Sequence, residues 1–518
     1  MVDLNWKNKS KFARAKIDFP KEFSIKIFEY FDGKFSRKYK TLKKTQENNN
    51  CDEISLLNKD KWINLLFWGD NKVLLKYLIK KFKERVRLIY IDPPFATGGD
   101  FNYKILIGNE ERKKIESIST KAYSDSWKNG IESYLNFLYE RLVLIKELLA
   151  EDGSIYIHLD WHISHYVKVI LDEIFGEGNF RNEIIWAYPA ASAKTRNFFI
   201  RSYDTLLFYT KSDEYVFNDD PRIYMEYSDR VKNALKEDEK GLFYYRGGSH
   251  DGKKLSRKVY VKNKGIFPRD VWNDIPYIRA NTLEYQGFST QKPERLLKRI
   301  ILASSNEEDV IADFFCGSGT TLAAAEKLNR RWIGCDINFH SIHISKKRLL
   351  TLNTTKDLTN KKRIYKKPVK SFAIMSTKEY LEKAINIDRE LFKNSGEDSN
   401  DQKIENNLEI IVKAKKKDKH VAVELVNYKN PYDSMLKDNV IGKIKTWNEF
   451  IDFWSIDYNF NEKYMHNIWY SLRIPKDRQL ELTSQPYEFK DAGKYTLKVK
   501  VIDIFGNTAY KILNISIS

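Results

Sequence analysis

Short apolar runs alternate with helical segments through the first two thirds of this chain, and this rhythm constrains its fold most. The run 64–68 ends at Gly69-Asp70-Asn71, and an amphipathic helix is expected from Lys72 to about Lys83. Strands that are apolar on both faces and separated by helices predict a parallel sheet covered on both sides, which is a doubly wound α/β fold. Further strands are expected at 86–91, 154–159, 310–312 and 331–335, and further helices at 134–149 and 320–328.

Charge points to a class of partner. The 518 residues are 42% hydrophobic and carry a formal net charge of +19, and nearly all of that charge falls within the first 370 residues. Such asymmetry indicates that this part of the chain meets a polyanion, and nucleic acid is the obvious one. A Lys-rich composition with no ligand behind it is the plain alternative.

Cysteine usage and hydropathy exclude several classes. Cys51, Cys316 and Cys335 include no C-x-x-C pair, so neither a disulfide framework nor a structural zinc site is expected. No stretch approaches the roughly 18 apolar residues that a membrane helix needs, and residues 1–7 lack the apolar core of a secretory signal. We expect a cytoplasmic protein with no membrane contact. His158, His162 and His165 have metal-like spacing, but they are expected not to converge, and no metal is predicted.

A glycine-rich turn follows the strand 310–312 and reads Asp313-Phe314-Phe315-Cys316-Gly317-Ser318-Gly319-Thr320-Thr321. Glycines at a strand end let the backbone turn tightly and approach a ligand, and ligands of open α/β sheets bind there. The next strand ends at Asp336, which can accept hydrogen bonds from a ribose diol. The third glycine of the dinucleotide fingerprint is missing, as is a P-loop Gly-Lys-[Ser/Thr], which disfavours NAD and ATP.

The tetrad Asp92-Pro93-Pro94-Phe95 follows the strand 86–91. Two prolines can simply end a strand, but a chemical interpretation is also available. An exocyclic base amine is a poor nucleophile because its lone pair is delocalised into the ring. Hydrogen bonds from its two protons, to the Asp92 side chain and the Pro93 carbonyl, would favour a pyramidal nitrogen with a directed lone pair. Phe95 can stack on a base that has been flipped out of a duplex.

Together these motifs resemble the β-group amino-methyltransferases of DNA, in which a D-P-P-[FY] tetrad precedes the cofactor F-x-G-x-G motif. The likeness covers about residues 60–355 and is to the modification subunits of type III restriction–modification systems and their solitary relatives. Two departures are Phe314, where the family often has proline, and Phe95, where tyrosine is commoner. The segments that extend the resemblance are Tyr123-Ser124-Asp125-Ser126-Trp127, 153–162, Asn182-Glu183-Ile184-Ile185-Trp186 and Thr290-Gln291-Lys292-Pro293.

The resemblance implies S-adenosyl-L-methionine as cofactor and assigns roles by position. Asp92, Pro93, Pro94 and Phe95 would form the catalytic loop. The residues expected to bind the cofactor are Asp313, Phe315, Gly317, Gly319 and Thr320 in the turn, Asp336 at the ribose, Asp70 near the adenine, and Thr290, Gln291 and Lys292 at the methionine end.

Changes in composition divide the chain into six segments, and two of them form the Rossmann-like methyltransferase core of permuted motif order that the resemblance implies. The third segment is polar and basic, and it stands where the family keeps its target-recognition region; its candidate DNA contacts are Lys253, Lys254, Arg257, Lys258, Lys262 and Lys264. A β-hairpin is expected from strands 495–501 and 510–515. The segments are a basic N-terminal extension (1–60), the catalytic half of the core (61–214), the target-recognition insertion (215–275), the cofactor half (276–365), a linker (366–408) and a small β-rich C-terminal domain (409–518).

The function expected is site-specific transfer of a methyl group from S-adenosyl-L-methionine to the N6 amino group of adenine in duplex DNA, within a restriction–modification system. Aspartate at the start of the tetrad favours adenine over cytosine N4, which is the nearest rival. A non-catalytic specificity subunit is a second rival, which the intact tetrad and turn disfavour. RNA or protein glutamine methylation is a third, but those relatives typically read Asn-Pro-Pro. A homodimer and a nuclease–helicase restriction subunit are candidate partners, and the recognition sequence cannot be read.

Overall fold

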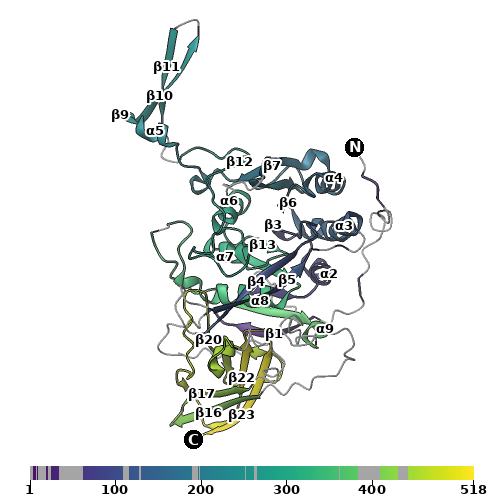
Figure 1. Cartoon of the computed structure of the whole chain (residues 1–518), viewed down its shortest axis with the longest axis vertical. Helices are drawn as coiled ribbons and strands as arrows, with labels where there is room; N and C mark the ends of the chain where they lie inside the picture. The colour runs from purple at the N-terminus through teal and green to yellow at the C-terminus, as the bar shows by residue number, and fades with distance from the viewer. Residues whose placement is uncertain are drawn as a thin grey trace.

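A central sheet of eleven strands organises the computed structural model (Figure 1). The structure describes residues 4–6, 9, 19–20, 25–33, 62–108, 116–125, 127, 130–188, 197, 199–250, 253–261, 265–360, 362–382, 409–429 and 442–518. In spatial order the strands are β12 (Val271–Trp272), β7 (Phe180–Ala187), β8 (Tyr203–Thr210), β6 (Leu149–Leu159), β3 (Val86–Ile91), β13 (Val310–Asp313), β14 (Arg331–Asp336), β2 (Asn64–Trp68), β15 (Phe372–Thr377), β1 (Ile25–Phe31) and β19 (Met465–His466).

The six strands from β6 to β15 are all parallel and form the middle of this sheet. Every residue of β2 and of β13 is buried, as expected for strands with a layer of structure on each face. The predicted strands at 64–68, 86–91, 310–312 and 331–335 are confirmed, each to within one residue.

Helices cover both faces of the sheet, which confirms the doubly wound α/β class. One core joins the sheet to α2 (Asn71–Phe82), α3 (Ile131–Leu148) and α4 (Ser164–Phe175). A second core on the opposite face contains apolar side chains of α6 (Glu294–Ser304), α7 (Thr320–Lys327) and α8 (Phe339–Leu350). Leu65 and Phe67 of β2 belong to the first core and Leu66 and Trp68 to the second, because successive side chains of a strand point to opposite faces.

Chain order and spatial order differ in the way that a permuted core requires. β3 precedes β13 by more than half the length of the core, yet the two strands are hydrogen-bonded neighbours, with Leu88 opposite Ile311 and Ile89 opposite Ala312. The segments that follow them therefore leave the sheet at the same edge. None of the helices in the described part of the chain is long and apolar enough to cross a membrane.

Two predicted boundaries need correction. The linker 366–408 begins inside the sheet, because β15 pairs with β2 and all its side chains are buried. The extension 1–60 likewise contributes β1, which pairs with β15 and with β19. Both strands depend on partners remote in sequence. After β15 comes α9 (Lys378–Glu382), and residues 383–408 of the predicted linker lie outside the described part.

A narrow unit projects from the body at the top of Figure 1. It consists of α5 (Asp229–Asn233) and a three-stranded antiparallel sheet of β9 (Lys236–Asp238), β10 (Gly241–His250) and β11 (Lys253–Tyr260). This unit falls within the predicted insertion 215–275, but the predicted range is wider than the unit at both ends. The last part of the predicted range contains β12, which belongs to the central sheet. Near the start of the range, the backbone N–H of Asn218 donates to Ala303 O at the end of α6.

The C-terminal strands form two further sheets. One contains β16 (Glu409–Lys417), β17 (His420–Lys429) and β21 (Tyr487–Glu488), and the other contains β20 (Trp469–Leu472), β18 (Ile451–Asp457), β22 (Gly493–Asp503) and β23 (Thr508–Ile517). β22 and β23 pair antiparallel, which confirms the predicted hairpin. These sheets share a core with the hairpin β4 (Asp100–Ile107) and β5 (Glu116–Ser124). Arg478 also donates to the carbonyls of Leu106 and Gly108, which ties that hairpin to the C-terminal region.

A buried ionic cluster joins both ends of the chain to the core. Glu29 of β1 accepts a hydrogen bond from Lys500 of β22 and lies 3.5 Å from the ammonium of Lys346 of α8. All three residues are at most 2% exposed. Burial alone would raise the pKa of Glu29, but the charges of the two lysines outweigh it and lower that pKa to about 2.

We predict that Glu29→Gln lowers the free energy of unfolding at pH 7 by about 3 kcal/mol, because it leaves two buried ammonium groups without a counter-charge. The carboxylate stabilises the fold at pH values above its unfolded pKa of 4.5, and this contribution disappears as the pH falls towards 2. Urea unfolding at pH 7 and at pH 3 measures both effects. Glu409→Gln removes an exposed pair with Lys429 and serves as a control expected to change stability by less than about 1 kcal/mol. Equal losses in both variants would contradict a buried cluster.

Candidate active site

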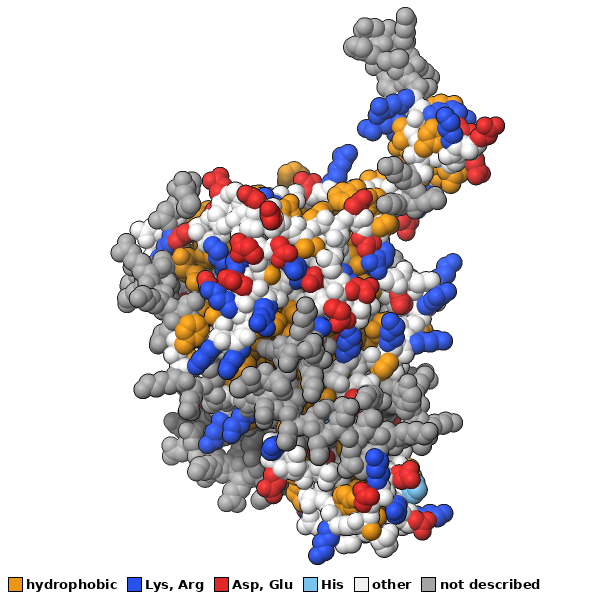
Figure 2. Space-filling model, turned by 180° about the vertical axis from the view of Figure 1, so that it is seen from behind, with side chains coloured by type: hydrophobic (Ala, Val, Ile, Leu, Met, Phe, Trp, Pro, Cys, Tyr) orange, Lys and Arg blue, Asp and Glu red, His pale blue; other side chains and the backbone are white. Residues whose placement is uncertain are grey.

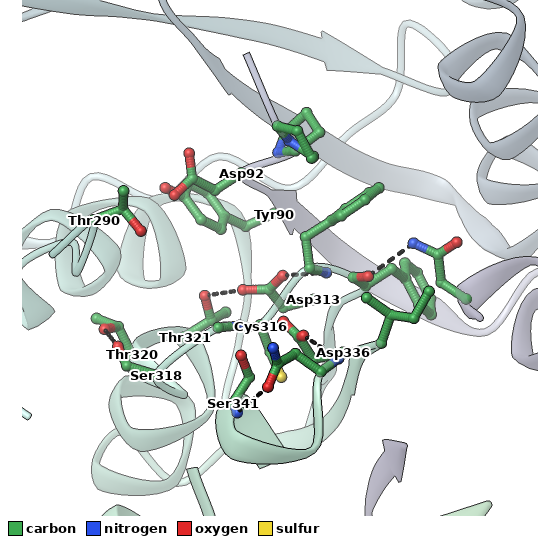
Figure 3. Close-up of a pocket in the computed structure, with 18 of the residues that line it drawn as sticks. Tyr90, Asp92, Thr290, Asp313, Cys316, Ser318, Thr320, Thr321, Asp336 and Ser341 are labelled. Atoms are coloured by element: carbon green, nitrogen blue, oxygen red, sulfur yellow. Dashed lines mark hydrogen bonds between the residues drawn. The ribbon is translucent and has the colours of Figure 1, made fainter. Parts of the chain in front are cut away.

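Four parallel strands end together at one edge of the sheet and form a pocket. β3, β13, β14 and β2 are consecutive neighbours, and the residues at or just after their ends include Asp92, Asp313, Asp336 and Asp70. The cavity between these loops has a volume of about 250 Å³. In the view of Figure 3, Asp313 lies between Asp92 and Asp336. This is the carboxyl edge, where ligands of open α/β sheets bind.

Nearly all of the catalytic and cofactor residues expected from the sequence line this one cavity. Gly319 is the exception: it lies at the start of α7, and a Cβ there would meet Ser345 Oγ at 2.7 Å. The glycine is therefore needed for packing against α8. The residues on the lining are Asp92, Pro93, Pro94, Phe95, Asp70, Thr290, Gln291, Lys292, Asp313, Phe315, Gly317, Thr320 and Asp336.

One buried carboxylate anchors the loop that contains the tetrad. Asp125 is 0% exposed and accepts hydrogen bonds from the backbone N–H groups of Phe95, Ala96 and Thr97, at 3.2, 3.0 and 2.8 Å. The indole of Trp127 donates to the same carboxylate at 3.1 Å. Ala96 has a φ of +55°, a strained conformation for alanine that must be maintained by its surroundings. Asp125 supplies that support.

Phe95 rests on a polar network beneath the pocket. Its ring stacks on His158, with centroids 6.3 Å apart and planes 16° from parallel. His158 Nδ1 lies 2.9 Å from the Tyr90 hydroxyl and its Nε2 lies 2.9 Å from Asp204 Oδ2. Burial would raise the pKa of Asp204, but the hydrogen bond and charge of His158 lower it. These contacts fix the plane on which Phe95 lies.

The histidine spacing noted in the sequence has a structural explanation. His158 lies between Tyr90 and Asp204, whereas His162 contacts Asp160 at 2.5 Å. Within the described ranges, no three His, Cys, Asp or Glu residues are grouped closely enough to hold a metal ion.

The glycine-rich turn is held by carboxylates from its own strand and the next. Gly317 N donates to Asp336 Oδ2 at 2.9 Å, and Phe315 N donates to Asp313 Oδ1 at 3.0 Å. Gly317 has a φ of +48°, which favours glycine. Burial raises the pKa of Asp313 to about 7, although hydrogen bonds from Thr321 and Phe315 act in the opposite direction. The carboxyl nearest the turn is therefore protonated over much of the acidic range.

A further network connects β2 to the same turn. Asp70 caps α2 by accepting from Lys72 N, and it also accepts from Arg141 Nη2 at 2.8 Å. Arg141 Nε donates to Asn71 Oδ1 at 2.6 Å, and Asn71 Nδ2 donates to the Phe314 carbonyl at 2.9 Å. Asp70 is therefore positioned by α3 as well as by its own strand.

Several pocket residues were not predicted. Arg141 and Phe137 come from α3, and Phe288 comes from the loop after β12. Nothing in their local sequence marks them, because they reach the pocket only through long-range packing. Tyr90 and Asn71 each lie within two residues of a predicted site residue, so the strand ends could have indicated them. Trp127 belongs to a segment that the resemblance had already singled out.

Lys292, which is expected at the methionine end of the cofactor, lines the pocket and also contacts the tetrad. Its ammonium donates to Asp92 Oδ2 at 2.7 Å and lies 5.3 Å from the centre of the Phe95 ring. The side chain points to the tetrad.

Four of the six candidate DNA contacts lie on the projecting unit. Lys253, Lys254, Arg257 and Lys258 belong to β11, whereas Lys262 and Lys264 lie outside the described residues. Arg257 is exposed, and Lys258 donates to Asp238 at 2.9 Å. Arg246 of β10, which was not predicted, stands directly opposite Arg257. Figure 2 shows Lys and Arg side chains on this unit, with acidic and apolar ones among them.

Comparisons with known proteins show which family the chain resembles. A family model described as DNA methylase matches residues 86–347. The type II methyltransferase M.EcaI of Enterobacter cloacae is 32% identical over 316 residues, which cover 53% of this chain and 66% of that protein. The DNA adenine methyltransferase YhdJ of Escherichia coli (strain K12) is 30% identical over 267 residues, covering 51% and 76%. The StyLTI Mod subunit of Salmonella typhimurium, part of a type III restriction-modification enzyme, is 26% identical over 348 residues, covering 53% and 52%.

Among solved structures, the complex of M1.HpyAVI with SAM aligns with a TM-score of 0.32 and 18% identity, over 55% of this chain and 99% of that one. The fold and the pocket define an α/β protein with a permuted Rossmann-like core. With the match to the family model, the chain belongs to the DNA methylase family.

The raised pKa of Asp313 predicts a pH-dependent difference between the wild type and Asp313→Asn. The folded state holds the proton up to about pH 7, whereas the unfolded state releases it near 3.8. As the pH rises between these values, the wild type should lose stability relative to the variant, with a slope of at most about 1.4 kcal/mol per pH unit. Below and above this window the difference should be constant. Urea unfolding of both proteins from pH 4 to 9 measures it, and parallel curves would show that Asp313 titrates normally.

Proposed function

We propose that this protein transfers a methyl group from S-adenosyl-L-methionine to the N6 amino group of adenine in duplex DNA. One observation carries the proposal. Asp92 Oδ1 is buried at the edge of the pocket and has no hydrogen-bond partner among the described residues. A buried acceptor left without a donor is energetically unfavourable, and an N–H of a substrate amine would satisfy it.

The residues around Asp92 suit an exocyclic amine. Asp92 Oδ1 would accept one of its protons and the carbonyl of Pro93 the other, which favours a pyramidal nitrogen with a directed lone pair. The prolines fix their own φ and carry no N–H that could compete. Phe95, held from below by His158, offers a flat face for a base flipped out of the helix.

The pocket also fits an adenosyl cofactor. Asp336 accepts backbone hydrogen bonds from Gly317 and Asn338, and each carboxylate oxygen has a second lone pair for a ribose hydroxyl. Gly317 lines the pocket without a side chain, and its φ of +48° favours glycine. When bound, the cofactor supplies an electrophilic methyl group on a sulfonium. The protein contributes the placement of the two reactants, which can account for much of the acceleration.

Adenine is the favoured base, and a restriction–modification system the favoured context. YhdJ is named as a DNA adenine methyltransferase, and StyLTI Mod as a subunit of a type III restriction-modification enzyme. The match spans about half the length of that Mod subunit. Assembly of this chain with a nuclease–helicase subunit, or as a homodimer, is therefore stated as part of the proposal. Transfer to cytosine N4 is the alternative within the same chemistry.

The basic unit would contact the DNA backbone. Arg246 and Arg257 face each other across the hairpin, an arrangement in which like charges repel and which a phosphate group would relieve. We predict that Arg246→Ala with Arg257→Ala weakens duplex binding and lowers the slope of log Kd against log salt by about 0.9 for each phosphate that the protein no longer neutralises. Fluorescence anisotropy across a salt series measures both quantities. Lys415→Ala, which changes an exposed lysine on β16, is the control. An equal slope in the double-arginine variant and in this control would refute the role of the two arginines.

The function is tested by product analysis. Unmethylated genomic DNA, which offers most short target sequences, is incubated with cofactor and digested to nucleosides for mass spectrometry. The wild type should produce N6-methyladenine. Asp92→Ala should reduce the rate at least about a hundredfold, because the amine loses an acceptor that acts in the transition state. Asp213→Ala changes a carboxylate that is 90% exposed and should leave the rate unaltered.

Other products would discriminate the alternatives. If the product is N4-methylcytosine, the substrate base is cytosine and not adenine. Equal labelling by wild type and Asp92→Ala would remove the catalytic role of the tetrad. Competition with RNA and protein acceptors in the same assay would expose a different substrate class.

A further inference from the structure

One ion pair joins the two halves of the active site. Lys292 and Asp92 stand 200 positions apart in the sequence, yet Lys292 Nζ lies 2.7 Å from Asp92 Oδ2. Their side chains are only 10% and 18% exposed. Because little solvent surrounds the pair, its attraction is stronger than that of a surface salt bridge.

The pair makes the two oxygens of Asp92 unequal. An ammonium can only donate hydrogen bonds, and it occupies Oδ2. Oδ1 is buried and has no partner within the described part of the chain. The carboxylate is therefore held with one oxygen engaged and the other available to a donor from outside.

Lys292 is itself fixed to the glycine-rich turn. Its carbonyl accepts a hydrogen bond from Thr320 Oγ1 at 3.1 Å, and Thr320 Oγ1 accepts one from Arg348 at 2.8 Å. Arg348 also pairs with Glu294 of α6 at 2.8 Å, two residues beyond Lys292. These hydrogen bonds connect the backbone at Lys292 to the turn and to α8. The fixed backbone limits the positions that the ammonium can take near Asp92.

The surroundings explain why a cation suits this place. The Lys292 ammonium lies 5.3 Å from the centre of the Phe95 ring, within the range of a cation–π interaction. Its charge also acts on Asp204. Burial would raise the pKa of Asp204, but its neighbours, His158 foremost and Lys292 among them, lower that pKa. Lys292 therefore faces two carboxylates and the ring on which the base is proposed to lie.

We propose that Lys292 is the positioning residue of the catalytic carboxylate: by holding Asp92 Oδ2, it directs Oδ1 at the amino group that is methylated. This role rests on the proposed function and leaves the transfer itself unchanged. In that step the nitrogen lone pair would form the bond to the methyl carbon, the carbon–sulfur pair would stay on sulfur, and one of the two amino protons would then be lost to water. The role differs from contact with the methionine end of the cofactor, which the resemblance implied for the same lysine.

The test compares Lys292→Met, which keeps the length of the side chain and removes its charge, with Lys292→Arg. Lys168→Met is the matched control, since Lys168 makes a 2.8 Å pair with Asp172 on α4, away from the pocket. Two quantities are measured: the single-turnover rate of methyl transfer at saturating cofactor and DNA, and the Kd of S-adenosyl-L-methionine by calorimetry.

We expect Lys292→Met to slow transfer about a hundredfold, as misplacement of a catalytic group does, while the cofactor Kd changes less than about threefold. Lys292→Arg should restore part of the rate, and Lys168→Met should match the wild type.

A readout independent of activity accompanies these measurements. In a double-mutant cycle on unfolding, the effects of Lys292→Met and Asp92→Asn should be non-additive if the side chains interact. Additive effects would overturn the proposal. So would a Kd raised tenfold or more with an unchanged rate at saturation, which would make Lys292 a cofactor ligand. If the wild type transfers no methyl group, the proposed function fails, and this is seen before any variant is compared.

Discussion

The pairing of β3 with β13 is the constraint on which the rest of the structure depends. These strands are parallel neighbours, with Leu88 opposite Ile311, so the tetrad and the glycine-rich turn leave the sheet at one edge. Neither loop could form the pocket alone, because Asp92 comes with the first and Asp313 with the second. The helices on both faces bury the strands and fix this register, and they thereby place two remote segments around one cavity.

Buried polar groups then give that cavity its precision. Asp125 satisfies three successive amides of the tetrad loop, and Arg141 holds both Asp70 and Asn71. Lys292 crosses between the halves and engages one oxygen of Asp92. Each group is buried and hydrogen-bonded, so each restricts a loop that would otherwise sample many conformations. Pre-organisation of this kind serves a reaction in which the protein mainly orients two reactants.

The sequence was informative where structure is set locally. β2 and β3 coincide with the predicted segments, because an apolar run followed by Gly-Asp or Asp-Pro-Pro signals both the strand and its end. The role of Asp92 after β3 followed from the chemistry of its loop, whereas that of Asp70 after β2 followed only from the resemblance to the DNA amino-methyltransferases. What could not be predicted depends on remote partners: β15 pairs with β2 and β1, and β1 pairs with β15 and β19. Arg141 likewise reaches Asp70 from another helix. The side chain of Lys292 reaches Asp92, which lies 200 positions away in the sequence.

The central claim is that Asp92 Oδ1 receives the amino group of a flipped adenine. A crystal structure with duplex DNA containing the target site and a non-reactive analogue of the cofactor tests it most directly. We expect the adenine to lie outside the duplex on the Phe95 ring, with its amino nitrogen about 3 Å from Asp92 Oδ1 and Lys292 still on Oδ2. An adenine that stays stacked in the helix, or whose amino group is bound elsewhere while Oδ1 remains without a donor, would contradict it.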